Sequence, residues 1–323
     1  MPTDRVFLTG AGGFIGSHVF RELRSAGYPV RVLLRDKQNF AHDDIVIGDL
    51  RRPGEFARAL EGCRYVVHCA ALYSFTPADR AALHETNVRG TAGLLEAARI
   101  AGIERAVVTS SSATLGPSRD GTPRTEADYA HDERGSGYHR SKIEQERAAF
   151  AARVPVIALL PTAPVGPADA KPTPTGQLIV EFTRGRIFAK PPRGGMNIVP
   201  VEDVARAHVA ALRQGRTGER YILGGENVTL DRLWEMLSQL TGTKMPSWRV
   251  PHAVALGIAH LDEARSRLTG ARPFVPIEGV RMSRELMFAD NSKAKRELDF
   301  HPGDAMGALS RAIAWYREHG YAG

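Results

Sequence analysis

The 323-residue sequence predicts an α/β fold in which a doubly wound parallel sheet is joined to a smaller, mostly helical C-terminal cap. Three observations lead to this prediction. Short apolar segments alternate with segments of helical length through the first half of the chain. A glycine-rich turn joins the first apolar segment to the first helical one. The second half is interrupted by prolines, which are unfavourable inside a sheet.

Six apolar segments of the first half have the length and composition of buried strands. They are Val6–Thr9, Val30–Leu34, Ile45–Ile47, Tyr65–His68, Arg105–Ser110 and Val156–Leu160. Four segments between them are expected to be helical: Phe14–Ala26, Pro53–Leu60, Val88–Ala101 and Gly137–Ala152. Because parallel strands need crossover connections, we expect helices on both faces of a single sheet.

The second half opens with the proline- and glycine-rich segment Pro161–Gly176. Helices are expected beyond it at Gln177–Arg184, Val201–Arg213 and Leu230–Thr241. Prolines at positions 172, 174, 191, 192 and 200 argue against a continuous sheet here. We therefore predict a first domain over residues 1–165 and a cap over residues 166–323. Segments within about 197–223, namely Asn197–Val201 and Tyr221–Leu223, are expected to return to the first domain.

Composition narrows the class of protein. Hydrophobic residues make up 43% of the chain, enough for a large core. Cys63 and Cys69 are too few for a disulfide framework, and no metal-binding pattern surrounds them. Neither a signal peptide nor a run of about 18 apolar residues is present, so we expect a soluble cytoplasmic protein without a transmembrane segment. The net charge is +7, but the Lys and Arg residues are spread along the chain among Asp and Glu residues, which argues against nucleic-acid binding.

The glycine-rich turn spans Thr9–Gly16 and has the pattern of a dinucleotide-binding Rossmann motif. Gly10 permits a tight turn, Gly13 lets the backbone approach a pyrophosphate, and Gly16 lets the helix pack near the strand. The pyrophosphate would lie at the helix N-terminus, where free N–H groups and the helix dipole favour anions. The expected cofactor contacts in this turn are Gly10, Gly12, Gly13, Phe14, Ile15 and Gly16.

Two further motifs indicate acid–base chemistry. Tyr138 and Lys142 are four residues apart, which places them on one face of a helix. A neighbouring ammonium, together with the positive ring of the cofactor, is expected to depress the tyrosine pKa and make it a usable acid or base. Hydroxyl side chains within Thr109–Gly116 follow an apolar strand, where ligands of open parallel sheets bind.

With these motifs the chain resembles the extended short-chain dehydrogenases/reductases of the NAD-dependent epimerase/dehydratase superfamily. Its other markers are Gly48-Asp49-Leu50, Val67-His68-Cys69-Ala70-Ala71, Asn87-Val88-Arg89-Gly90-Thr91 and Asp290-Asn291-Ser292-Lys293-Ala294. Within the superfamily, three segments resemble the hopanoid-associated sugar epimerases, which are close to dihydroflavonol 4-reductase. These segments are residues 113–116, 171–176 and 224–227.

The resemblance implies roles for matching residues. Asp49 and Leu50 would contact the adenine of the cofactor. Ala70 and Ala71 would line the cofactor channel, and Pro161 and Thr162 would lie beside the nicotinamide. The family's catalytic Ser/Thr lies five residues before the glycine that closes the serine motif. Counting back from Gly116 indicates Ser111, and strand alternation is expected to turn Ser110 and Ser112 away from it.

The sequence departs from the family at two positions expected near a substrate head group. Leu115 replaces a frequent tyrosine, and Pro200–Asp203 replaces a His-Val-Asp-Asp stretch, which argues against a sugar nucleotide as substrate. Three residues are hypotheses for contact with substrate: Tyr73, Ser112 and Lys171. The alternatives are a core position for Tyr73 and simple solvation for Lys171. Val254–Leu268 is expected to be a core or dimer helix, with a lid over a lipid substrate as the alternative.

Cofactor choice depends on the residue that ends the second strand. In the run from Val32 to Lys37, Arg35 occupies that position and would bind the 2′-phosphate of NADP(H), with Lys37 adding charge. A slip of one residue would put Asp36 there and favour NAD(H) instead. We therefore predict a preference for NADP(H).

These observations predict an NAD(P)-dependent enzyme in which Ser111, Tyr138 and Lys142 are catalytic. The expected reaction is NADPH-dependent reduction of a small or lipid-linked carbonyl compound. An alternative is a hopanoid-associated sugar epimerase that oxidises and re-reduces one carbon without net redox change. A remote alternative is a non-catalytic dinucleotide sensor, which predicts loss of the Tyr-x-x-x-Lys pattern that this chain keeps. The resemblance also implies a homodimer.

Overall fold

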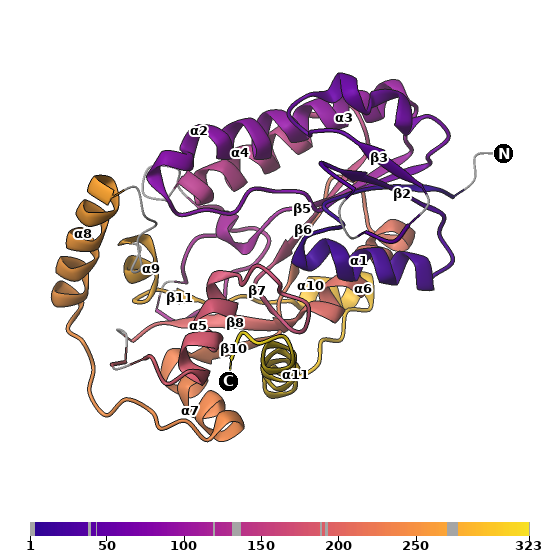
Figure 1. Ribbon diagram of the computed structural model, residues 1–323. Coiled ribbons are helices and arrows are strands. Elements are labelled where there is room, and N and C mark those ends of the chain that lie inside the picture. Colours follow the sequence, from indigo (N-terminus) through magenta and orange to yellow (C-terminus); the bar gives the residue numbers. More distant parts are fainter. Residues whose placement is uncertain are drawn as a thin grey trace.

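The computed structural model describes residues 4–37, 40–42, 44–118, 120–130, 137–187, 189–190, 193–269 and 277–322. Its centre is a parallel sheet with the strand order β3-β2-β1-β4-β5-β6-β9 (Figure 1). The strands are β1 Val6–Thr9, β2 Val30–Leu34, β3 Ile45–Ile47, β4 Tyr65–His68, β5 Arg105–Thr109, β6 Val156–Pro161 and β9 Arg220–Leu223. The strand order reverses between β1 and β4, so a crevice is expected outside their carboxyl ends.

Helices cover both faces of this sheet, as the sequence predicts. On one face α1 (Phe14–Ser25) packs against α6 (Val201–Gln214), and on the other α3 (Gly90–Ile100) packs against α4 (Gly137–Ala151). Alternation along β1 explains both cores: Val6 and Leu8 lie in the cluster under α1 and α6, whereas Phe7 lies in the cluster under α3. The doubly wound parallel sheet is therefore confirmed.

Two connections differ from the expected helices. Pro53–Leu60 forms two 3₁₀ turns, Pro53–Glu55 and Ala57–Leu60, rather than one helix. Upstream of α3, a short helix α2 (Arg80–Leu83) continues into a π-helical turn at His84–Arg89. The helix predicted from Val88 therefore begins as α-helix only at Gly90, whose lack of a side chain admits Leu50 beside it.

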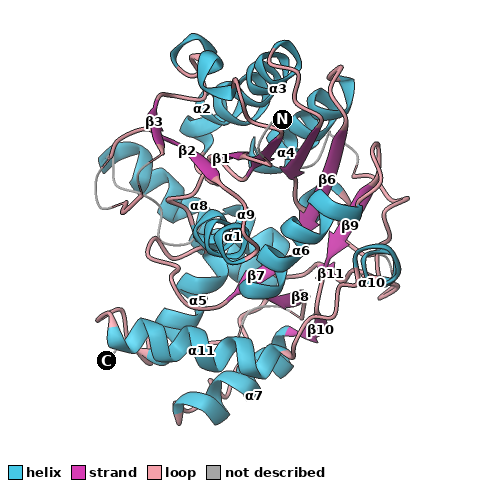
Figure 2. Cartoon of the chain, turned by 90° about the vertical axis from the view of Figure 1, so that its right-hand side faces the viewer, coloured by secondary structure: helices cyan, strands magenta, loops and turns pink. Residues whose placement is uncertain are grey.

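A second, smaller sheet corrects two expectations (Figure 2). Its central strand β8 (Gly195–Pro200) pairs antiparallel with β10 (Glu226–Thr229) and parallel with β7 (Ala163–Val165) and β11 (Leu286–Met287). Prolines do not prevent this sheet, because Pro164 lies in β7, whose pairing is with β8 alone, and Pro200 ends its strand. Pro191 and Pro192 lie outside the described residues.

Of the segment Asn197–Val201, residues 197–200 therefore belong to the small sheet and Val201 begins α6, so this segment does not return a strand to the large sheet. The other predicted return does occur, because Tyr221–Leu223 lies in β9 beside β6. The chain thus crosses between the two sheets more than once. The boundary at residue 165 stays a proposal.

Helices α5 (Pro174–Thr183), α7 (Leu230–Thr241) and α11 (Ala305–Glu318) enclose a separate apolar core beside the small sheet. Helix α10 (Ser292–Leu298) packs on β9 and α6. Helix α8 (His252–Thr269) lies at the periphery beside α9 (Ile277–Met282) (Figure 1). Leu261 is 74% exposed and Leu268 is 88% exposed, so these two side chains do not lie in a core; a dimer helix and a lid over a lipid substrate stay predictions for α8. Among the described residues, no helix has the length and hydropathy of a membrane span.

Candidate active site

The turn after β1 has the steric properties predicted for its glycines. Gly10 has φ +80°, in the left-handed region, and a Cβ there would lie 2.5 Å from the backbone nitrogen of Ala70. A Cβ on Gly16 would lie 2.0 Å from the carbonyl oxygen of Gly10. Both positions therefore require glycine, the first for backbone conformation and both for close backbone approach.

The start of α1 presents an anion-binding surface. Gly12 and Gly13 are exposed, and Gly13 caps the helix while its N–H donates to Gly10. The N–H of Ser17 is bonded to the Gly13 carbonyl, so the N–H groups of Phe14, Ile15 and Gly16 precede the first intrahelical bond. Free N–H groups beside glycines without side chains fit the pyrophosphate of a dinucleotide.

Residues expected around the adenine end lie beside this turn. Arg35 and Lys37 are exposed immediately after β2, whose Leu34 side chain lies 3.9 Å from a Cβ placed on Gly12. Asp49 is buried, and its carboxylate binds the Arg51 guanidinium at 2.6 Å, which lowers the pKa of Asp49 to about 2. Leu50 is buried against Gly90.

The residues expected beside the channel and the nicotinamide follow β4 and β6. The N–H of Ala70 donates to the Thr9 hydroxyl at 3.3 Å, and Ala71 is exposed. Pro161 ends β6, and the Thr162 hydroxyl donates to Asn197 of β8 at 2.8 Å. These residues therefore share with the glycine turn the edge where the parallel strands end.

Ser111 and Tyr138 are brought close together, and the Ser111 side chain acts to lower the pKa of Tyr138. Tyr138 is the second residue of α4, and Ser111 caps the 3₁₀ turn Ser112–Thr114, its Oγ accepting from the Ala113 N–H at 3.1 Å. The alternation argument fails for Ser112, because β5 ends at Thr109 and Ser112 lies in the turn. Ser110 is buried and donates to Glu146 instead.

Lys142 lies one helical turn beyond Tyr138 and is only 2% exposed. Its Nζ donates to the Thr109 carbonyl at 2.9 Å and to Oε1 of Gln145. Burial lowers the pKa of Lys142 to about 8, and the negative charge of Glu146 opposes this shift.

In the structure the pKa of Tyr138 is shifted in the direction opposite to the one expected from the sequence. Burial raises the pKa of Tyr138 to about 12, and the Ser111 side chain acts in the opposite direction. Burial is the larger of these two effects, and the Lys142 ammonium donates to Thr109 and Gln145. Tyr138 is therefore held in its protonated form near neutral pH.

Four aromatic rings form one wall of the site, hereafter the aromatic wall: Tyr73, Phe75, Tyr138 and His139. The centroids of Tyr73 and Tyr138 are 4.2 Å apart, and Phe75 stacks on His139 at 6.1 Å. Tyr73 is 46% exposed, so its place is at the site and not in the core. Phe75 lies in the loop after β4, where no strand or helix periodicity applies, and it was not predicted from the sequence.

The other residues expected near a substrate lie in different environments. Lys171 is exposed in the loop before α5, and Ser112 is half-buried. Leu115 is buried among Ala158, Leu160 and Ile222 under the sheet, so its expected place near the substrate is wrong. The Glu202 carboxylate pairs with Arg311 of α11 at 3.0 Å.

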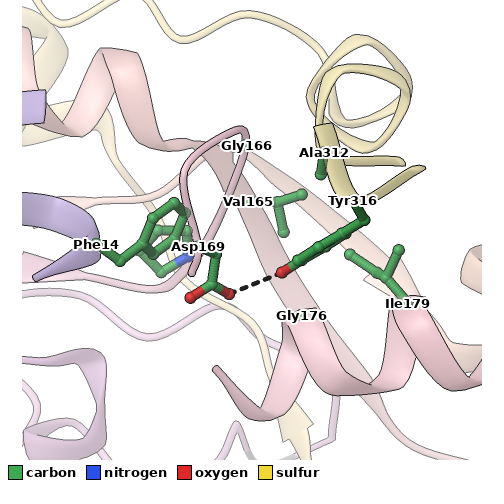
Figure 3. A pocket seen from close by; sticks show the side chains of 9 residues that line it. Phe14, Val165, Gly166, Asp169, Gly176, Ile179, Ala312 and Tyr316 are labelled. Carbon is green, nitrogen blue, oxygen red and sulfur yellow. Dashed lines mark hydrogen bonds between the residues drawn. The ribbon is translucent and has the colours of Figure 1, made fainter. Parts of the chain in front are cut away.

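A small pocket lies between Phe14, at the start of α1, and residues of β7, α5 and α11 (Figure 3). It is lined by Phe14, Asp169, Gly176 and Tyr316, among others, and the Tyr316 hydroxyl donates to Asp169 at 2.9 Å. A Cβ on Gly176 would lie 2.2 Å from that hydroxyl, so glycine allows the contact. Within the described residues, His, Cys, Asp and Glu side chains form no group of three suited to a metal ion.

Comparisons with known proteins agree with this geometry. A model of the NAD dependent epimerase/dehydratase family matches residues 6–224. A putative dihydroflavonol 4-reductase from Synechocystis sp. is 38% identical over 98% of this chain and 96% of its own length. Sterol demethylase protein B from Methylococcus capsulatus is 33% identical over 97% of this chain and 98% of its own. The crystal structure of gox2253 has a TM-score of 0.86 at 38% identity, covering 99% of this chain and 100% of that one.

Proposed function

Because this chain belongs to the NAD-dependent epimerase/dehydratase family, which makes it an oxidoreductase or epimerase, we propose that it is an NADPH-dependent reductase of an apolar carbonyl compound. The observation that carries the proposal is the proximity of Ser111 to Tyr138, one helical turn from Lys142 and beside the ring of Tyr73. Two hydroxyls converging at the carboxyl end of a strand suit a carbonyl oxygen, which accepts two hydrogen bonds.

A bound nicotinamide dinucleotide supplies the hydride in such a reduction. The N–H groups at the start of α1 would hold its pyrophosphate, and Lys142 would hold its nicotinamide ribose. The pairs Asp49 and Leu50, Ala70 and Ala71, and Pro161 and Thr162 would line the remainder of its site. Arg35 and Lys37, exposed at the end of β2, support a preference for a cofactor with a 2′-phosphate.

The protein's own residues move the proton. Ser111 would orient the carbonyl oxygen, and the Tyr138 hydroxyl would donate its proton to that oxygen. A tyrosine pKa of about 12 keeps this donor protonated near neutral pH. The positive charge of Lys142 would then stabilise the tyrosinate that remains.

The aromatic wall supports an apolar, ring-containing substrate over a sugar nucleotide. Tyr73 offers a partly exposed ring next to the proposed proton donor, and Phe75 packs against that ring. The names of the two relatives, a dihydroflavonol reductase and a sterol demethylase protein, refer to ring-system compounds, which is consistent with this class. Lys171 and Ser112 stay hypotheses for contact with the polar end of a substrate.

An epimerase is the second candidate, because the matching family model covers such enzymes and both reactions use the same residues. An epimerase returns the hydride to its substrate and needs no exchange of cofactor. A reductase must release oxidised cofactor after each turnover. Cofactor that stays bound through purification would therefore favour the epimerase.

The experiment is to follow NADPH oxidation with a panel of cyclic apolar ketones and with nucleotide sugars. We expect NADPH consumption with a ketone, and a higher KM for that ketone in Tyr73→Ala, because the exposed ring is removed. Tyr73→Phe is the matched control, since it keeps the ring. Interconversion of a nucleotide sugar without net NADPH consumption would replace the reductase proposal with the epimerase.

A further inference from the structure

A chain of buried hydrogen bonds runs beneath the proposed catalytic residues. Lys142 donates to Oε1 of Gln145, and Nε2 of Gln145 donates to the Thr91 hydroxyl at 3.0 Å. That hydroxyl lies 2.8 Å from Nε2 of His68, and Nδ1 of His68 lies 2.7 Å from the Thr9 hydroxyl. Gln145, Thr91, His68 and Thr9 are all completely buried. None of the four is accounted for by the proposed reaction.

The direction of each bond at His68 follows from counting protons. The Thr91 hydroxyl gives its one proton to the Asn87 carbonyl at 2.6 Å, so it can only accept from His68. His68 must therefore carry its proton on Nε2, and its Nδ1 accepts from the Thr9 hydroxyl. Burial lowers the pKa of His68 to about 3, which keeps the ring neutral and this arrangement intact.

The same count fixes the orientation of the Gln145 amide. Because Thr91 has no proton left to give, the group of Gln145 that faces Thr91 must be the NH₂ donor. The carbonyl oxygen of Gln145 then faces the Lys142 ammonium. A reversed amide would place an N–H group against the ammonium and a carbonyl against an oxygen that has no proton to offer.

We propose that Gln145 is a positioning residue for Lys142, with Thr91 and His68 fixing its amide so that an acceptor meets the ammonium. This inference rests on the proposed function, in which Lys142 serves the nicotinamide ribose and Tyr138. Lys142 has three N–H donors; Thr109 and Gln145 take two of them, which leaves one for the crevice.

The charged and titratable groups around Lys142 are few. Glu146 on the same helix favours its charged form, as does Cys69 at the end of β4 in its ionised form. Glu146 is itself paired with Arg220 of β9, and His68 is neutral. Tyr138, on the same helix, is protonated near neutral pH. The uncharged Gln145 carbonyl is thus an acceptor that holds the ammonium without adding a negative charge.

The test replaces Gln145 with leucine, which is similar in size but has no polar side-chain atoms. We expect dinucleotide affinity to fall about tenfold, because a hydrogen bond to a charged group is lost. The carbonyl also favours the charged lysine, so its removal lowers the Lys142 pKa. The fall of kcat at high pH should therefore begin roughly one pH unit lower, while the KM for the carbonyl substrate is unchanged.

Ile143→Val is the matched control, because Ile143 is buried on the same helix and has no polar contact to lose. Thr91→Val should shift cofactor affinity and the pH profile in the same direction as Gln145→Leu. Thr91→Ser, which keeps the hydroxyl, should have the affinity and pH profile of the wild type. The double variant Gln145→Leu/Thr91→Val should be no worse than Gln145→Leu alone, since both act through one chain. Should Gln145→Leu fail to fold, the Thr91→Val and Thr91→Ser pair carries the same test.

Wild-type cofactor affinity and pH profile in Gln145→Leu would overturn the inference, as would additive effects in the double variant. Lys142→Met separates this failure from failure of the proposed function. If Lys142→Met keeps both affinity and turnover, the proposed function is wrong. If Lys142→Met loses them while Gln145→Leu does not, only the positioning role of Gln145 is wrong.

Discussion

The guanidinium Nε of Arg220 lies 2.8 Å from a carboxylate oxygen of Glu146, in an ion pair whose side chains are only 5% and 4% exposed. Glu146 lies one turn beyond Lys142 on α4 and accepts from the Ser110 hydroxyl. Arg220 begins β9 and donates to the Thr114 hydroxyl at 2.8 Å. The pair therefore joins the helix that carries Tyr138 to the turn that carries Ser111.

Removing one member of this pair should leave a buried charge without its partner. We expect Glu146→Leu to lower the free energy of unfolding by about 3–5 kcal/mol, measured by urea denaturation. The double variant Glu146→Leu/Arg220→Met should lose less free energy of unfolding than the single variant Glu146→Leu. Glu144→Leu, which removes the partner of the more exposed Arg140 on the same helix, should change stability by at most about 1 kcal/mol. Equal losses at positions 144 and 146 would contradict this account.

Tyr138→Phe should lower turnover by roughly 10²–10⁴-fold, because the proton donor is lost while the ring still packs on Tyr73. Cofactor affinity should stay nearly unchanged, as titration of dinucleotide into the variant would show. A variant that keeps more than half of the wild-type rate on a true substrate would exclude Tyr138 as the acid.

Ser111→Ala should impair catalysis more than Ser112→Ala. Ser111 is the serine that lies next to Tyr138 and acts on its pKa, whereas Ser112 begins the next 3₁₀ turn. Steady-state kcat/KM for both variants on one carbonyl substrate makes the comparison. Equal losses, or a larger loss at position 112, would reverse the assignment.

Gly16→Ala should prevent cofactor binding and destabilise the fold, because its new methyl group would lie 2.0 Å from the Gly10 carbonyl oxygen. Gly12→Ala is the matched comparison, since a Cβ there would lie at an ordinary van der Waals distance of 3.9 Å from the Leu34 side chain. Thermal denaturation of the ligand-free variants should show a lower Tm for Gly16→Ala only. A wild-type Tm for Gly16→Ala would mean that the turn adapts to the methyl group.

NADP(H) should bind more tightly than NAD(H), because Arg35 and Lys37 place positive charge where a 2′-phosphate would lie. Arg35→Ala should weaken NADPH binding and leave NADH binding largely unchanged. Titrating both cofactors into wild type and variant decides the matter. Tighter NADH binding in wild type, or unchanged NADPH affinity in Arg35→Ala, would identify Asp36 as the residue that governs the choice.

The sequence alone was sufficient to predict the features that depend on neighbours along the chain. The strands β1 to β4 match their predicted bounds, because a buried parallel strand is a short apolar run between turn residues. The left-handed φ of +80° at Gly10 and the one-turn spacing of Tyr138 and Lys142 likewise depend on local geometry.

Only the tertiary structure decided which distant residues meet. The small sheet joins four segments between Ala163 and Met287, and no local pattern specifies that β8 pairs with strands on both sides. The orientation of Gln145 depends on Thr91, 54 residues earlier, and the partner of Glu146 is 74 positions later in the chain. Periodicity shows which face of an element is buried, but the partner against which it is buried is set by packing of the whole chain. The direction of the Lys142 ammonium, which Thr109 and Gln145 set, and the burial that raises the Tyr138 pKa could therefore not be predicted from the sequence.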